Sequence, residues 1–191
     1  MQELHRALNA VLPNDIWVEA VTRVPEGFHP RFHAVARRYR YQIGMVPLAE
    51  SPFFRSWCWP LDRPVEVDLL HRAAALIPGE RSFRAFAKTG QEHRGDRCHV
   101  MEARWVPWDD VGMAFLITAN RFLHHMVRYL VGTMVEIGWE RRPLEEMRAL
   151  LEDPETEHVM SRPAPPEGLF LSRVEYPEDA GQKPPILAAE S

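Results

Sequence analysis

The segment from Phe122 to Ile137 constrains the fold more than any other part of this sequence. Its apolar residues recur at helical spacing and cover a wide face of a predicted helix. The run is interrupted by Glu136 and is too short to span a bilayer. We therefore expect a helix buried against a large apolar surface, with Gly138 as its C-cap. The apolar positions are Phe122, Leu123, Met126, Leu130, Val131, Met134 and Val135.

Segments with strand character lie on both sides of this helix. Residues 98–106 and 111–120, joined through Asp109 and Asp110, predict an antiparallel hairpin. Residues 37–46 alternate, which predicts a strand with Arg37, Tyr39, Tyr41 and Ile43 on one face and Arg38, Arg40 and Gln42 on the other. Other expected elements are strands at 16–21 and 170–176, helices at 2–11, 68–77 and 143–151, an irregular aromatic stretch at 47–64 and a polar loop at 83–97. The chain lacks the alternation of strands and helices that a parallel sheet requires. We predict an α+β fold, with a mainly antiparallel sheet and helices packed on one face.

Length and composition agree with a globular protein. The chain has 191 residues, of which 46% are hydrophobic and 26% charged, as in ordinary folded domains. The N-terminus has no apolar segment of the kind that a signal peptide carries. Two cysteines are too few for a disulfide framework, so we expect reduced thiols and a cytoplasmic location.

Charge is distributed unevenly. The net charge is −4, but residues 1–128 carry a balance of +3 and residues 129–191 a balance of −7. Arginines 31, 37, 38 and 40 lie in an acid-free stretch that also contains aromatic residues. Arginine binds phosphate through forked donors and aromatic rings stack on bases, so Arg31, Arg37, Arg38 and Arg40 are candidate RNA-binding residues. The alternative for each is a solvated sheet surface.

Generic catalytic motifs are absent from the sequence. It contains no glycine-rich nucleotide-binding loop and no Gly-x-Ser-x-Gly turn. On the predicted helix His124 and His125 would point about 100° apart, and Cys58 and Cys98 have no nearby cysteine partner, so we predict no metal site. Arg128 lies on the largely apolar helix and needs an anionic partner there. The alternative is a structural ion pair with an acid of this chain, such as Glu102 or Asp68.

Several segments together resemble the TruA-type tRNA pseudouridine synthases. They occur in family order, and the block His-His-Met-Val-Arg at 124–128 is the most specific of them. The segments are LNAVLPNDIWV at 8–18, HPRFHAVARRYRYQI at 29–43, SFRAF at 82–86, NRFLHHMVRYLVGTMVEIG at 120–138 and EGLFLSRVEYP at 167–177.

The resemblance implies an enzyme that isomerises uridine to pseudouridine in the anticodon stem-loop of tRNA. It implies a pseudouridine-synthase-like fold, a homodimer, and a reaction without cofactor or metal. Tyr39 matches the family tyrosine that stacks on the target uracil, and Arg128 matches the arginine that pairs with the catalytic aspartate. Such a pair orients the carboxylate and keeps it ionised.

One family motif has no counterpart in the sequence. The catalytic aspartate of the family lies in a Gly-Arg-Thr-Asp motif, expected before Leu8, and no aspartate of this chain follows Gly-Arg-Thr. We interpret residues 1–30 as a remnant of the N-terminal half, 31–177 as the C-terminal synthase domain and 178–191 as a flexible tail. Three hypotheses follow: a shortened form of a synthase, a non-catalytic RNA-binding remnant, or a pseudogene product that barely folds. If the chain folds, we expect Arg128 to contact water, an anion or a substitute acid.

Overall fold

The computed structural model describes residues 1–88, 95–153 and 161–177. The chain divides into two compact units, the first formed by residues 1–35 and 175–191 and the second by residues 36–174. The predicted tail at 178–191 lies outside the described residues, and the predicted division at residue 30 stays a prediction. Each unit is described by itself.

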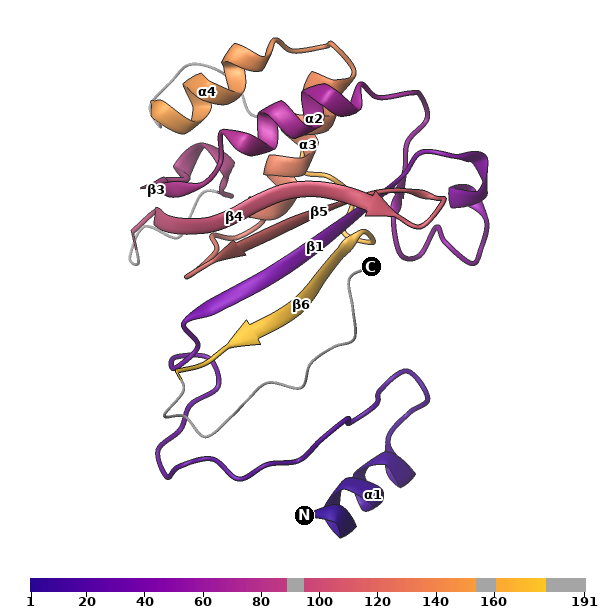
Figure 1. Ribbon diagram of the computed structural model, residues 1–191, viewed down its shortest axis with the longest axis vertical. Helices are drawn as coiled ribbons and strands as arrows, with labels where there is room; N and C mark the ends of the chain where they lie inside the picture. The colour runs from indigo at the N-terminus through magenta and orange to yellow at the C-terminus, as the bar shows by residue number, and fades with distance from the viewer. Residues whose placement is uncertain (89–94, 154–160, 178–191) are drawn as a thin grey trace. The chain divides into compact units, whose positions relative to one another are not determined.

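The second unit is built on a six-stranded sheet with helices on one face, which confirms the α+β prediction (Figure 1). The strand order is β2-β1-β5-β4-β3, and β6 also pairs with β1. The strands are β1 (Ala36–Gly44), β2 (Trp59–Pro60), β3 (Gly79–Ser82), β4 (Arg97–Trp108), β5 (Gly112–Ala119) and β6 (Leu169–Glu175). The sheet is mainly antiparallel, but the short strand β2 pairs with β1 in parallel.

The helix layer covers the sheet with α2 (Val67–Ala75), α3 (Met126–Gly138) and α4 (Leu144–Glu152) (Figure 1). The predicted apolar face of α3 is buried: Met126, Leu130 and Met134 have almost no exposed surface. They join side chains of the sheet, including Tyr41 and Phe115, in one continuous core. Two short 3-10 turns, Pro47–Glu50 and Arg84–Phe86, complete the unit. None of the helices in the described part of the chain is long and apolar enough to cross a membrane.

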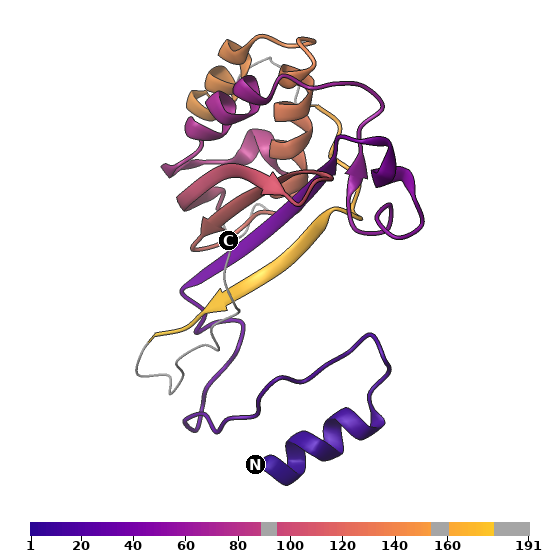
Figure 2. The ribbon, with the colours of Figure 1, turned by 45° about the vertical axis from the view of Figure 1, so that its right-hand side comes forward.

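The strand predicted at 37–46 is present as β1 and ends at Gly44, but the predicted alternation holds only in part, because Gln42 on the opposite face is also buried. Tyr41 and Ile43 are fully buried beneath the helices, and Tyr39 packs at the margin of the same core. The hairpin of β4 and β5 is also confirmed, with Asp109 in the turn at a φ of 44°. β6 runs beside β1 (Figure 2). Its register is set by two hydrogen bonds, from Gln42 N to Gly168 O at 2.9 Å and from Ser172 Oγ to Arg38 O at 3.1 Å.

Helix α3 begins and ends differently from the prediction. It starts at Met126, so His124 and His125 precede it, and His125 is the N-cap with a left-handed φ of 64°. Gly138 is the last helical residue rather than the cap. A Cβ at Gly138 would lie 2.3 Å from Val65 Cγ2, so close packing on α2 and its preceding loop explains the glycine. Pro143, predicted to open the next helix in its first turn, is instead the N-cap of α4, which begins one residue later at Leu144.

The polar loop predicted at 83–97 is partly wrong. Phe83 and Phe86 are fully buried in the core, because the 3-10 turn at Arg84–Phe86 packs against α3. Residues 89–94 of this segment lie outside the described residues. Cys58 and Cys98 are free and buried, and burial raises the pKa of the Cys98 thiol to about 11.

In the first unit, the helix predicted at 2–11 is confirmed as α1 (Gln2–Val11). The strand predicted at 16–21 is wrong, because this segment forms no ladder among the described residues. Its backbone is held by a side chain instead. The Asn9 amide donates to Val18 O and accepts from Val18 N, both at 2.8 Å.

Candidate active site

Tyr39 and Arg128 mark one region of the second unit, where β1 runs beneath the start of α3. The Tyr39 ring is half-buried and packs edge-on against Phe122, with ring centroids 4.9 Å apart. Phe122 begins the loop that leads into α3, and Arg128 lies in the first turn of that helix. The structure therefore attaches both predicted site residues to the same loop–helix junction, although 89 positions separate them in the sequence.

Arg128 is held by the segment that leads into β6. Its Nε donates to Ala164 O at 2.6 Å, and its own carbonyl accepts from Ala164 N at 2.9 Å. The neighbouring Tyr41 hydroxyl donates to Pro165 O at 2.7 Å. Burial raises the pKa of Tyr41 well above its usual value, and the nearby charge of Arg128 acts in the opposite direction. The tyrosine thus stays a neutral donor.

No described residue offers Arg128 a carboxylate, and its guanidinium contacts a backbone carbonyl. Of the three partners that we expected, the substitute acid is therefore not found among the described residues, and contact with water or an anion stays a prediction. The alternative of a structural pair with Glu102 or Asp68 is wrong. Glu102 pairs with Arg104 at 2.6 Å and Arg38 at 3.4 Å, while Asp68 pairs with Arg72 at 3.7 Å. The Nε bond orients the guanidinium and leaves its terminal nitrogens for an anion, as a bidentate arginine–carboxylate pair requires.

The segment 161–168 packs against α3 and thereby positions the Arg128 side chain. Thr133 Oγ1 lies 3.3 Å from Ser161 Oγ, and a Cβ at Gly132 would lie only 2.3 Å from Arg162 O. Segment 161–168 was not among the predicted site residues, because nothing in its local residue pattern points to Arg128.

Three of the four candidate RNA-binding arginines lie on β1 in the second unit, and Arg31 lies in the first unit. On the face of β1 opposite Tyr39, Arg38 binds Thr118 Oγ1 at 3.1 Å, and Arg40 lies 5.6 Å from the Phe170 ring centre. Arg37 donates to Asn120 O at 2.7 Å. Arg31 belongs to the first unit, where its guanidinium lies 6.0 Å from the Phe32 ring centre.

A second group of cationic residues gathers at the N-terminus of α3. The His124 and His125 rings lie 4.0 Å apart, and Lys88 N donates to His124 O at 3.2 Å. Burial and the positive charges of His124, Arg128 and Lys88 lower the pKa of His125. Within residues 1–88, 95–153 and 161–177, no group of three or more His, Cys, Asp or Glu residues could hold a metal ion.

Comparison with known proteins places this chain in a class of RNA-modifying enzymes. A family model described as tRNA pseudouridine synthase matches residues 73–177, which include Arg128 but not Tyr39. Among curated relatives, tRNA pseudouridine synthase A of Chlorobium luteolum is 38% identical over 181 residues, 95% of this chain and 70% of the relative. The enzymes of Dictyoglomus thermophilum and Bacteroides fragilis are each 34% identical, covering 91% and 90% of this chain and 69% and 67% of their own lengths. The chain belongs to the tRNA pseudouridine synthase A family, the TruA type.

Proposed function

We propose that this chain acts in the isomerisation of uridine to pseudouridine in tRNA. In that reaction the C1′–N1 glycosidic bond breaks, the uracil rotates, and a C1′–C5 bond forms while the C5 proton is lost to solvent and N1 is protonated. The observation that carries the proposal is the family match together with Arg128, whose side chain is oriented by Ala164 O and has no carboxylate partner among the described residues. The target base must leave the RNA stack to reach such a site.

We assign the roles of the two central residues from the family resemblance. Tyr39 stacks on the extruded uracil, for which its half-buried ring beside Phe122 is suited. Arg128 orients the carboxylate of the catalytic aspartate. That aspartate lies in a Gly-Arg-Thr-Asp motif, which this 191-residue sequence does not contain.

We extend the proposal to the partner. The anticodon stem-loop is the expected part of tRNA, the expected assembly is a homodimer, and the expected location is the cytoplasm. Arg31, Arg37, Arg38 and Arg40 are proposed contacts to the RNA backbone. Cation–aromatic pairs such as Arg40 with Phe170 support this, because both groups also serve in RNA binding.

Tritium release tests the activity. Unmodified tRNA labelled with tritium at uracil C5 is incubated with the purified chain, and pseudouridine formation releases the label into water. Stoichiometric release of the label from particular anticodon-stem uridines is the expected result. The absence of release under conditions where tRNA is bound would contradict the catalytic proposal.

The second candidate function is RNA binding without catalysis. It is favoured by the absence of Gly-Arg-Thr-Asp from the sequence. In that case the chain binds tRNA with an affinity that falls steeply with salt, yet releases no tritium. The same two measurements therefore separate the two functions.

Substitution of Tyr39 tests the stacking role. Base–aromatic stacking contributes about 1–3 kcal/mol per base, so Tyr39→Ala is expected to weaken turnover or RNA binding by about 5- to 150-fold. Tyr39→Phe keeps the ring and the contact with Phe122, and should stay within a few-fold of the parent. If both variants lose function equally, the phenol hydroxyl rather than the ring face carries the role.

A further inference from the structure

We propose that Lys88, His124 and His125 form a binding site for a phosphodiester of the RNA backbone, beside the position of the target base. The inference rests on the proposed function, because it names the part of the substrate that these residues contact. We call the three residues the α3 cationic cluster.

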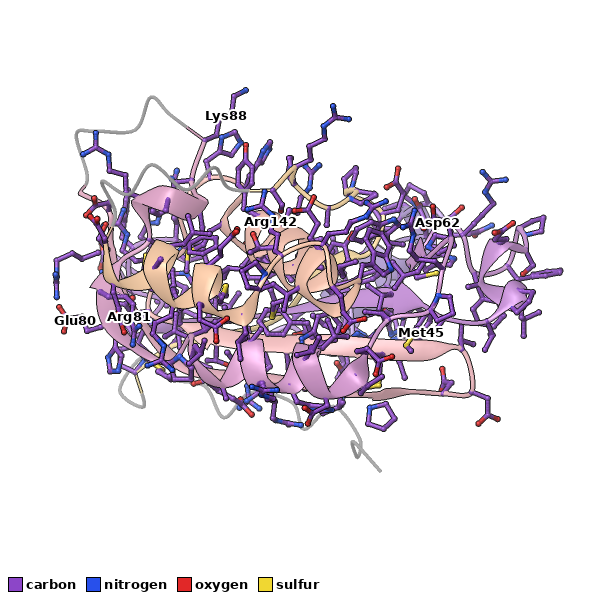
Figure 3. The ribbon with its side chains drawn as sticks, turned by 90° about the horizontal axis from the view of Figure 1, so that it is seen from above. Met45, Asp62, Glu80, Arg81, Lys88 and Arg142 are labelled. Atoms are coloured by element: carbon purple, nitrogen blue, oxygen red, sulfur yellow. The ribbon has the colours of Figure 1, made fainter. Side chains whose placement is uncertain are left out.

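The cluster gathers positive groups from two separate segments. Lys88 follows the 3-10 turn at Arg84–Phe86, and the Lys88 N to His124 O bond of 3.2 Å links its backbone to the loop before α3. The His124 and His125 rings lie 4.0 Å apart. Lys88 and His124 are exposed, and Figure 3 shows the Lys88 side chain projecting away from the ribbon. The side chains are thus open to a large ligand.

No carboxylate of the described residues neutralises these groups. The charged and titratable groups that face His125 are His124, Arg128 and Lys88, with the Tyr129 ring 6.3 Å away. Like charges held together are unfavourable unless an anion offsets them. The positive end of the α3 helix dipole adds to the same field. The arrangement therefore matches an anion better than a neutral or cationic ligand.

The position of the α3 cationic cluster indicates that this anion is a phosphate of the RNA backbone. The loop that carries the cluster begins at Phe122, whose ring contacts Tyr39, the proposed stacking residue. A nucleotide with its base on Tyr39 has a backbone phosphate within a few ångströms of its sugar. Arg128 is left to the catalytic carboxylate, so this phosphate needs other cations, and the cluster supplies them from the loop that carries Phe122 and from Lys88 beside it.

Proton linkage follows from this geometry. His125, whose pKa is lowered by burial and by its cationic neighbours, is mainly neutral at pH 7.5 in the free chain. A bound phosphate favours the protonated imidazole and raises that pKa. Binding then takes up protons, so RNA affinity increases as the pH falls from 8 to 6.

The first experiment measures binding of an anticodon stem-loop RNA to the full chain by fluorescence anisotropy. Lys88→Gln is expected to lower affinity about two- to fivefold and to reduce the salt slope by about 1. The double variant His124→Gln/His125→Gln should leave affinity at pH 8 nearly unchanged and remove most of its rise at pH 6. His71→Gln, an exposed histidine on α2, is the matched control and should behave as the parent.

The second experiment does not depend on RNA. Histidine titrations are followed by proton NMR with and without inorganic phosphate, and the resonances are assigned from the Gln variants. Phosphate should raise the midpoints of His124 and His125 by about half a pH unit and leave His71 unchanged. If phosphate affects no histidine, or all of them equally, the site is overturned, whatever the RNA result.

The remaining outcomes are also distinct. A phosphate response at His124 and His125 in a chain that binds no RNA keeps the anion site and overturns the proposed function. A phosphate response with unchanged RNA affinity and salt slope in every variant overturns the assignment to the RNA backbone. Thermal unfolding of each variant within a few degrees of the parent excludes misfolding as the cause.

Discussion

In a synthase that carries the Gly-Arg-Thr-Asp segment as well as this chain, replacing Arg128 by alanine is expected to reduce pseudouridine formation by about 150- to 5,000-fold. Leaving one member of a charge pair without its partner in a partly buried site costs about 3–5 kcal/mol, and each 1.36 kcal/mol is a factor of ten in rate. Arg128→Lys should recover little of this loss. An ammonium group cannot donate to Ala164 O through Nε and still present a planar fork to a carboxylate.

The folded state should tolerate the same change. Arg128→Ala removes the hydrogen bond to the uncharged carbonyl of Ala164 and the packing of a half-buried side chain. We expect this to lower the melting temperature by only a few degrees in a protein of this size. Arg72→Ala is the matched control, because Arg72 is exposed and pairs with Asp68 at 3.7 Å. Tritium release within tenfold of the parent by Arg128→Ala would show that this arginine has no part in the chemistry.

Gly132→Ala is expected to destabilise the protein by about 2 kcal/mol or more, although alanine has a higher intrinsic helix propensity than glycine. In an isolated helix the same change is favourable by about 1 kcal/mol. Here the new Cβ would lie 2.3 Å from Arg162 O and 2.7 Å from Ser161 Oγ. The first of these is a backbone atom, so segment 161–168 must move as a whole.

Gly138→Ala gives the internal comparison within α3. Its new Cβ would lie 2.3 Å from Val65 Cγ2 and 3.1 Å from Leu70 Cδ2, which are side-chain atoms that rotate away more easily than a backbone carbonyl. Urea denaturation of both variants is expected to show the larger loss at Gly132. Because Ala164 lies in the displaced segment, Gly132→Ala should also lower turnover, whereas Gly138→Ala should not. Equal or greater stability of Gly132→Ala would contradict the close approach.

The main features of the fold were predictable from residue patterns because each depends on local periodicity. The apolar stripe of α3, the strand at β1 and the hairpin at Asp109 each follow from the spacing and type of residues that are neighbours in the chain. The strand expected at 16–21 was wrong because a strand needs a partner. The apolar pattern of these residues does not reveal that Asn9 binds the backbone of Val18. The start of α3 was placed four residues early because Phe122 and Leu123 are apolar without being helical.

For the candidate site, too, some features were predictable from the sequence and others depended on the tertiary structure. The sequence by itself determined which residues are the candidates for the chemistry, because Tyr39 and Arg128 lie within motifs that resemble those of one family. Only the tertiary structure decided what surrounds them. Hydrogen bonds between segments far apart in the chain place Ala164 on Arg128 and Lys88 beside His124. Such contacts depend on how the elements pack around a shared core, and no local pattern of residues encodes them.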